Sequence, residues 1–276
     1  MNRKTAIVTG ASSGVGRATA VELTRRGWHV ILAARSMEKT QPILHGIRAF
    51  GGSAEICQVD LGDLLSVRLA AQHILSEHGH IDLLINNAGI AGYHGRTVDG
   101  FEIHFGVNHL GHFLFTRLLL PRLVSSGMSR IVNVSSGSHY EADCLDLSNV
   151  CRPTQYLSGL PEYERSKLCN VLFTLELRRR LANTDVTCVS LHPGQVRSGI
   201  WDVIPQPIRW LITRKFLTDE EGAARVLHCA LGPEVSVSPA LYYDEMDPAE
   251  PSTIAQNERA ARLLWAKSSR WVGLEV

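Results

Sequence analysis

A glycine-rich turn, Thr9-Gly10-Ala11-Ser12-Ser13-Gly14-Val15-Gly16, joins the apolar run Ala6-Ile7-Val8 to a stretch with helical spacing. Its three glycines permit a tight turn, a close approach of the backbone to a pyrophosphate, and close packing of a helix on a strand. The free N–H groups and the dipole at the start of that helix favour phosphate groups. A glycine-rich turn alone is a weak signal, and an ordinary strand-to-helix turn is the alternative. Its place at the first strand–helix junction favours a dinucleotide site.

Strand-like and helix-like segments alternate along the rest of the chain. The runs rich in branched apolar residues, typical of buried parallel strands, are Ala6–Val8, Val30–Ala34, Ile81–Ile85, Ile131–Val134, Val186–Leu191 and Ala240–Tyr243. The stretches with apolar residues three and four apart are Val15–Arg26, Leu64–His78, Phe101–Val124, Glu164–Leu181 and Glu220–Ala230. This alternation predicts the α/β class: a single-domain, Rossmann-type, doubly wound parallel sheet with helices on both faces.

The length of 276 residues suits one large domain. We expect residues 1–192 to form the cofactor-binding and catalytic core. Frequent prolines divide residues 193–276 into short pieces, which we expect to form the wall of the substrate cleft and a C-terminal segment. Ser252–Lys267 is expected to form a closing helix, because Ile254, Ala261, Leu264 and Trp265 can share one face.

The composition argues against several classes of partner. A net charge of +1 without a long basic block gives no footprint for nucleic acid. The six cysteines show no paired spacing with one another or with histidine, so we expect reduced thiols and no metal site. Neither a secretion signal nor an apolar stretch long enough to span a bilayer is evident. We therefore expect a cytoplasmic protein with no integral membrane segment, and the sequence leaves open whether it forms a homo-oligomer.

The end of the second predicted strand bears on the choice of cofactor. An acidic residue there would accept hydrogen bonds from the ribose of NAD, whereas a basic residue suits the 2'-phosphate of NADP. The chain has Arg35, whose planar guanidinium matches phosphate oxygens, so NADP(H) is expected in preference to NAD(H). A solvated loop cation is the alternative. Asp60, in Val59-Asp60-Leu61 after the third strand, is placed to meet the adenine ring, or else it forms a turn or a helix N-cap.

Tyr163 and Lys167 form a YxxxK pair whose side chains share one face of a predicted helix. A nearby ammonium favours the phenolate of a tyrosine, so Lys167 is expected to help Tyr163 exchange a proton. Asn86–Gly89, Ser135-Ser136 and Pro193-Gly194 each follow a predicted strand, at the edge where open α/β sheets bind ligands. Ser136 can then hold a substrate oxygen to which Tyr163 donates, while nicotinamide supplies the hydride.

Asn108 lies in the long predicted helix after the fourth strand. Its amide is able to bend that helix locally and to hold a water that links Lys167 to solvent. A polar residue on an exposed helix face is the alternative.

Together these motifs resemble the signature set of the short-chain dehydrogenase/reductases over about the first two hundred residues. The retinol dehydrogenase-like branch is the most similar, through Val107–Phe113, Ser166–Phe173, His192–Ser198 and Leu227–Ala230. The resemblance implies a catalytic tetrad of Asn108, Ser136, Tyr163 and Lys167, with Val196 and Ser198 near the nicotinamide carboxamide and the phosphates. With the residues argued above, the expected cofactor-binding residues are Gly10, Ser12, Ser13, Gly14, Val15, Gly16, Arg35, Asp60, Leu61, Asn87, Ala88, Gly89, Tyr163, Lys167, Pro193, Gly194, Val196 and Ser198.

The chain also departs from that branch. Many relatives have a membrane-anchoring N-terminal segment that this sequence lacks, which speaks against a microsomal retinoid role. An insert, Gly137–Glu162, separates Ser136 from Tyr163 and is expected to form a flap beside the cleft. Light-dependent protochlorophyllide reductases share much of the pattern but resemble one another in a cysteine where this chain has Gln195.

The expected reaction is interconversion of a carbonyl and an alcohol on a hydrophobic small molecule, with Tyr163 as general acid and base. Retinal-like polyenes, medium-chain aldehydes, and steroid or polyketide carbonyls all remain open as substrates. Candidate pocket residues, for which ordinary packing is the alternative, are His139, Tyr140, Tyr156, Trp201 and Trp210. A non-catalytic NADPH-sensing protein is the main rival, since a fold does not fix a function, and a purely structural scaffold is the third.

Overall fold

The sheet of the computed structural model, which describes residues 3–196 and 216–276, has the strand order β3-β2-β1-β4-β5-β6-β7-β8. Seven strands run parallel. They are β1 (Thr5–Thr9), β2 (His29–Ala34), β3 (Ser53–Gln58), β4 (Leu83–Asn86), β5 (Arg130–Val134), β6 (Thr187–His192) and β7 (Tyr242–Asp244). The order reverses between β1 and β4, the switch point at which open α/β sheets bind ligands.

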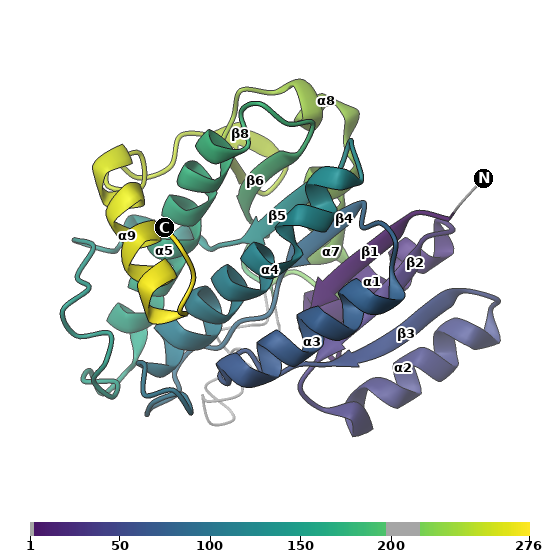
Figure 1. The fold of residues 1–276 in the computed structure, drawn as a ribbon, viewed down its shortest axis with the longest axis horizontal. Coiled ribbons are helices and arrows are strands. Elements are labelled where there is room, and N and C mark those ends of the chain that lie inside the picture. Colours follow the sequence, from purple (N-terminus) through teal and green to yellow (C-terminus); the bar gives the residue numbers. More distant parts are fainter. Residues whose placement is uncertain (1–2, 197–215) are drawn as a thin grey trace.

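Helices cover both faces of this sheet (Figure 1). The larger core lies under α3 (Leu64–Glu77), α4 (Gly111–Ser125), α5 (Leu160–Arg180) and α9 (Glu258–Trp271). The other core lies under α1 (Gly14–Arg25), α2 (Met37–Ala49), α7 (Asp219–Leu231) and the short α8 (Pro233–Val237). Alternate residues of β1 feed the two cores, with Ile7 in the first and Ala6 and Val8 in the second. The predicted α/β architecture is confirmed.

Three local features differ from the sequence-based expectation. The last strand, β8 (Asp247–Ala249), pairs antiparallel with β7, so the sheet is not wholly parallel. The helix α2 was not foreseen, because Pro42 interrupts its pattern; Ser36 caps it by accepting a bond from Lys39 N. The closing helix begins later than expected, at Glu258 after the Asn257 N-cap.

Residues of the closing helix pack as predicted. Ala261, Leu264 and Trp265 are buried, and Figure 1 shows α9 lying beside α5. No helix in the described ranges combines the length and the apolar character that a bilayer span requires.

Candidate active site

The glycine turn is packed against the loop that follows β4. Gly10 has a φ of +70°, and a Cβ there would lie 2.9 Å from the Cα of Ala88. A Cβ on Gly16 would lie 2.4 Å from Asn87 Nδ2 and 2.5 Å from the carbonyl oxygen of Gly10. Only glycine therefore fits at these two positions. The turn brings the first residues of α1 to the carboxyl edge of the sheet, at the switch point.

The start of α1 suits an anionic group. Its N-cap, Ser13, makes no side-chain capping bond, and its first turn has no acidic residue. The first N–H groups of a helix lack partners within the helix, and its dipole favours negative charge. These residues therefore fit the pyrophosphate of a nicotinamide dinucleotide.

Thr9 joins the two loops, a role that the sequence analysis did not assign to it. Its hydroxyl oxygen accepts hydrogen bonds from the main-chain N–H groups of Asn87 (2.9 Å) and Ala88 (3.0 Å). The side-chain amide of Asn87 donates a 2.9 Å bond to the Thr9 carbonyl. The Thr9 hydroxyl also lies 2.8 Å from Nε2 of the buried His112. The only sequence signal was a threonine directly before Gly10.

Three of the four predicted tetrad residues meet where α5 passes the end of β5. Tyr163 and Lys167 both lie in α5, and the Lys167 ammonium nitrogen is 5.6 Å from the centroid of the Tyr163 ring. The Lys167 ammonium donates a 3.3 Å bond to the Val134 carbonyl. Ser136, the N-cap of the 3-10 helix η2 (Gly137–Tyr140), hydrogen-bonds the Tyr163 phenol through its side chain.

The fourth, Asn108, lies in a π-helical segment, η1 (Phe105–Leu110), directly before α4. This segment provides the local departure from regular helix expected there. Asn108 is fully buried, which excludes an exposed helix face. Its Nδ2 donates to the Ile90 carbonyl (3.0 Å) and to Ser166 Oγ (2.9 Å). Asn108 thus ties the loop after β4 to the helical turn that precedes Lys167.

Burial shifts both titratable groups of the YxxxK pair. It raises the pKa of the Tyr163 phenol, and the hydrogen bond with Ser136 offsets only part of that rise. It lowers the pKa of the Lys167 ammonium to about 8. Desolvation is the largest influence on the phenol, so the expected help of Lys167 in proton exchange stays a prediction. The phenol is protonated at neutral pH.

The residues expected at the adenosine end of the cofactor differ in exposure and in contacts. Arg35 follows β2, is exposed, and has no ion-pair partner within residues 3–196 and 216–276. Asp60 makes a turn, since its Oδ1 accepts a 2.9 Å bond from Gly62 N, while Asp63 caps α3. Leu61 is buried in the larger core, and its carbonyl would lie 2.4 Å from a Cβ on Gly111.

Pro193 and Gly194 follow β6, and Gly194 has a φ of +84°. The buried Val196 lies beside Gly222 of α7, which also faces Val15 of the glycine turn. The chain after β6 is thereby brought back to the start of α1. Ser198, Trp201 and Trp210 lie outside the described residues.

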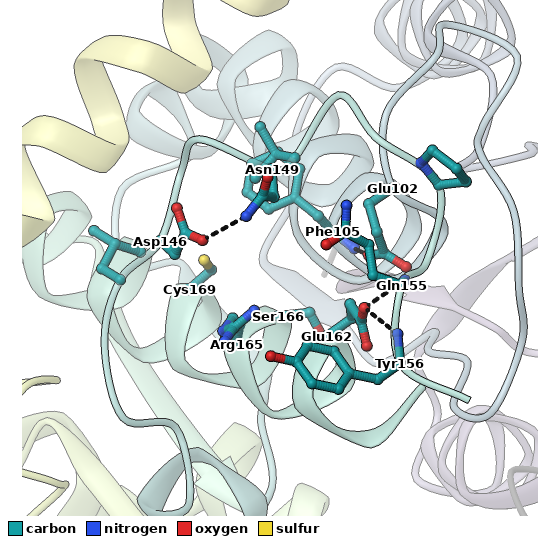
Figure 2. A pocket seen from close by; sticks show the side chains of 13 residues that line it. Glu102, Phe105, Asp146, Asn149, Gln155, Tyr156, Glu162, Arg165, Ser166 and Cys169 are labelled. Atoms are coloured by element: carbon teal, nitrogen blue, oxygen red, sulfur yellow. Dashed lines mark hydrogen bonds between the residues drawn. The ribbon is translucent and has the colours of Figure 1, made fainter. Parts of the chain in front are cut away.

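The insert packs behind the catalytic helix and encloses a cavity of about 100 Å³ with α5 (Figure 2). Tyr156 lines the cavity from the insert, and Glu162 and Ser166 line it from α5. One Glu162 oxygen, Oε1, accepts bonds from the main-chain N–H groups of Gln155 (2.8 Å) and Tyr156 (3.1 Å). Neither Tyr163 nor Lys167 lines this cavity, so it is separate from the tetrad.

Two other candidate pocket residues are packing residues. His139 is fully buried against Tyr242, with 4.8 Å between ring centroids. Its Nε2 accepts a bond from Ser252 N. The hydroxyl of the exposed Tyr140 donates to the Glu250 carbonyl. Both side chains fasten the start of the insert to the segment around β8.

The carboxyl edge of the sheet thus carries a phosphate-binding turn beside a tyrosine, a lysine and a serine. The family model for short chain dehydrogenase matches residues 4–143. Retinol dehydrogenase 11 of Homo sapiens is 41% identical over 278 residues, which cover 99% of this chain and 87% of that protein. An uncharacterized protein from Mycobacterium Paratuberculosis has the same fold, with a TM-score of 0.79 and 34% identity over 99% of this chain and 94% of the other.

A more distant solved structure supports the fold alone. The 3-ketoacyl-(acyl-carrier-protein) reductase from Brucella melitensis, complexed with NADH, has a TM-score of 0.69 and 24% identity over 87% of this chain and 96% of the other. The family resemblance predicted from the sequence is confirmed by the closer relatives. The chain therefore belongs to the short-chain dehydrogenase/reductase family and resembles, within it, the retinol dehydrogenases.

Proposed function

We propose that this protein is an NADP(H)-dependent reductase that converts a hydrophobic aldehyde or ketone to an alcohol, with Tyr163 as the proton donor. Family membership gives the coarser statement, an oxidoreductase that interconverts alcohols and carbonyl compounds with a nicotinamide cofactor. The observation that carries the proposal is the convergence of Ser136, Tyr163 and Lys167 at the carboxyl edge of the sheet. Gly89 lies beside them, since a Cβ there would be 3.3 Å from Lys167 Nζ.

The chemistry follows from the protonation states. The nicotinamide, when bound, supplies the hydride that reduces the carbonyl carbon. Ser136 and Tyr163 would hold the carbonyl oxygen, and the protonated phenol would donate to it as negative charge develops. The Lys167 ammonium, against the face of the same ring, would stabilise the phenolate left behind. We propose reduction as the direction to test first, because the protonated phenol is the form that donates to a carbonyl oxygen.

Arg35 supports the preference for NADP(H). Its guanidinium is exposed at the end of β2, where a 2'-phosphate would lie, and it is free to make a charge-assisted pair. The preference rests on this residue. Asn108 would position Lys167 through Ser166, and a water held beside it would return the proton from solvent.

Substrate turnover separates an enzyme from an NADPH sensor or a scaffold. The purified protein would be mixed with NADPH and a panel of aldehydes and ketones, with NADPH consumption followed optically and products identified by mass spectrometry. Wild type should turn over at least one hydrophobic carbonyl. Tyr163→Phe should abolish turnover while binding NADPH nearly as well, and the exposed Tyr93→Phe should match wild type. Tight NADPH binding with complete inertness would favour the sensor, and absence of binding would favour the scaffold.

We also propose a cytoplasmic location. The exposed Cys144 and Cys151 are both free thiols, a state that a reducing compartment preserves. Cell fractionation of the tagged full chain, with membrane and soluble fractions compared, tests this proposal.

A further inference from the structure

A cluster of two histidines and a glutamate lies near the amino ends of β2 and β3. His29 begins β2, and its register partner is Ser53, the first residue of β3. Glu55 is two residues further along β3, so it projects from the same face of the sheet as Ser53. His78 is the C-cap of α3. Residues from three elements therefore meet at the amino ends of these strands, where the proposed reaction uses no residue, away from the carboxyl edge with the glycine turn.

The potential ligand atoms of the cluster already face one another. His78 Nε2 is 2.6 Å from Glu55 Oε1, and His29 Nε2 is 4.0 Å from Glu55 Oε2. One ligand atom from each of the three residues lies within 4.8 Å of the others. The two imidazole rings are 5.6 Å apart between centroids and inclined by 31°. This spacing lets one ion bridge the three side chains once the direct His78–Glu55 contact opens.

Ser53 orients one of the ligands. Its hydroxyl lies 2.9 Å from His29 Nδ1. When Nδ1 carries the proton and donates to Ser53, the lone pair of His29 is on Nε2, the nitrogen that faces Glu55. Metal-binding histidines commonly have such a partner on the second ring nitrogen, because it fixes the tautomer and the ring orientation. An ion pair between His78 and Glu55 alone would give this contact between Ser53 and His29 no role.

The donor set identifies the class of ion. Two imidazole nitrogens and one carboxylate suit Zn²⁺ and its neighbours in the first transition series, whereas Mg²⁺ and Ca²⁺ prefer oxygen ligands. Bonds of about 2.0 to 2.2 Å around a tetrahedral Zn²⁺ place neighbouring ligand atoms roughly 3.3 to 3.5 Å apart. The 2.6 Å contact would open by less than about 1 Å, and the 4.0 Å contact would close by a similar amount. Three protein ligands leave the fourth tetrahedral position for water, which can reach the cluster because its side chains are partly exposed.

We propose that His29, Glu55 and His78 bind a single Zn²⁺ ion, which fastens α3 to the edge strand of the sheet. β3 is the first strand in the sheet order, and an edge strand has one row of unpaired main-chain groups. An ion held by β2, β3 and the end of α3 would oppose fraying there. Because the ion binds the folded arrangement, it would raise the thermal unfolding temperature.

The test uses the full chain, stripped of metal with a chelator that is then removed. Zn²⁺ binding would be measured by calorimetry, Co²⁺ binding by its visible absorption, and stability by thermal unfolding. Wild type should bind one Zn²⁺, show the intense absorption of tetrahedral Co²⁺, and unfold at a higher temperature with Zn²⁺ than with Mg²⁺. His78→Gln and Glu55→Gln should each weaken Zn²⁺ binding by about tenfold or more and remove the Zn²⁺-dependent shift.

His73→Gln is the matched control, because His73 is an exposed histidine of α3 outside the cluster. It should bind Zn²⁺ as wild type does. Circular dichroism of each variant without metal would exclude misfolding, and a Ser53→Ala variant offers a milder test with an expected partial loss of affinity. The proposal is overturned by failure of wild type to bind Zn²⁺, or by equal Zn²⁺ affinity of wild type, His78→Gln and Glu55→Gln.

Discussion

The side-chain oxygen of Asn108 accepts a 2.8 Å hydrogen bond from Ile90 N, and its amide nitrogen donates a 3.0 Å bond back to the Ile90 carbonyl. This reciprocal pair closes the loop after β4 onto the π-helical segment. The same nitrogen donates to Ser166, the residue before Lys167. One buried amide thereby holds the loop that contains Gly89 at a fixed distance from the catalytic helix.

Replacing that amide should damage both stability and turnover. Asn108→Leu keeps the approximate volume but leaves the partly buried main-chain groups of Ile90 without their side-chain partner, at a cost of about 1 kcal/mol per group. We expect a lower free energy of unfolding and a lower kcat. Chemical denaturation and steady-state kinetics would measure the two effects. Asn183→Leu, at an exposed position, is the control and should change neither; an Asn108→Leu variant with wild-type kcat would contradict the positioning role.

Two of the helical glycines, Gly16 and Gly46, should respond to alanine in opposite ways. At Gly16 the added Cβ would lie 2.5 Å from the Gly10 carbonyl oxygen, so the turn must shift. A destabilisation of about 1 to 3 kcal/mol is expected, with dinucleotide affinity lower by about tenfold or more. At Gly46, inside α2, nothing lies within 4 Å of the added Cβ.

Gly46→Ala should therefore stabilise the protein by about 0.5 to 1 kcal/mol, because alanine has the higher helix propensity. Urea unfolding of both variants, with NADPH binding measured by fluorescence, tests the pair. Equal effects of the two substitutions would show that close packing at Gly16 is unimportant.

Local patterns were sufficient to predict the sheet, the glycine turn and the YxxxK helix. Period-two and helical spacing depend on near neighbours in sequence, and parallel strands bring their carboxyl ends to one edge. The antiparallel β8 was not predictable in this way, because a three-residue strand containing Pro248 has no recognisable pattern. The π-helix at Asn108 was anticipated only as a local bend.

Properties that depend on burial or on strand register could not be predicted from the sequence. The opposite shifts of the Tyr163 and Lys167 pKa values arise from desolvation, which α5 imposes only when it packs on the sheet. Similarly, His29, Glu55 and His78 have no metal-binding spacing along the chain. The pairing of β2 with β3 and the end of α3 bring them together.

Removing the guanidinium of Arg35 should lower the affinity for NADPH much more than the affinity for NADH. Arg35→Ala should weaken NADPH by about 1.5 to 3 kcal/mol, the range for a hydrogen bond to a charged group, and should leave NADH nearly unchanged. Fluorescence titration with both dinucleotides measures the difference. Arg48→Ala removes another exposed arginine, at the end of α2, and should affect neither cofactor. Equal losses for NADPH and NADH would remove the basis for the proposed preference.

Lys167 is expected to promote turnover and to lower the free energy of unfolding. Its pKa of about 8 lies below the ordinary value of 10.5 because the ammonium is buried. At neutral pH the folded protein keeps a buried charge that the unfolded chain would hydrate, so Lys167→Met should raise stability by about 1 to 3 kcal/mol. Turnover should be lost, because the cation beside Tyr163 is gone.

The pH dependence of the free energy of unfolding tests whether the buried Lys167 charge destabilises the folded protein. From about pH 8 towards pH 10.5 the folded wild-type protein releases the Lys167 proton before the unfolded chain does, so its stability rises with pH relative to that of Lys167→Met. The advantage of the variant should therefore shrink over this interval. Denaturant unfolding at several pH values would follow it, with the exposed Lys39→Met as a control that shows no such trend. A Lys167→Met variant less stable than wild type at neutral pH would mean that contacts of the ammonium, such as the bond to the Val134 carbonyl, outweigh its desolvation.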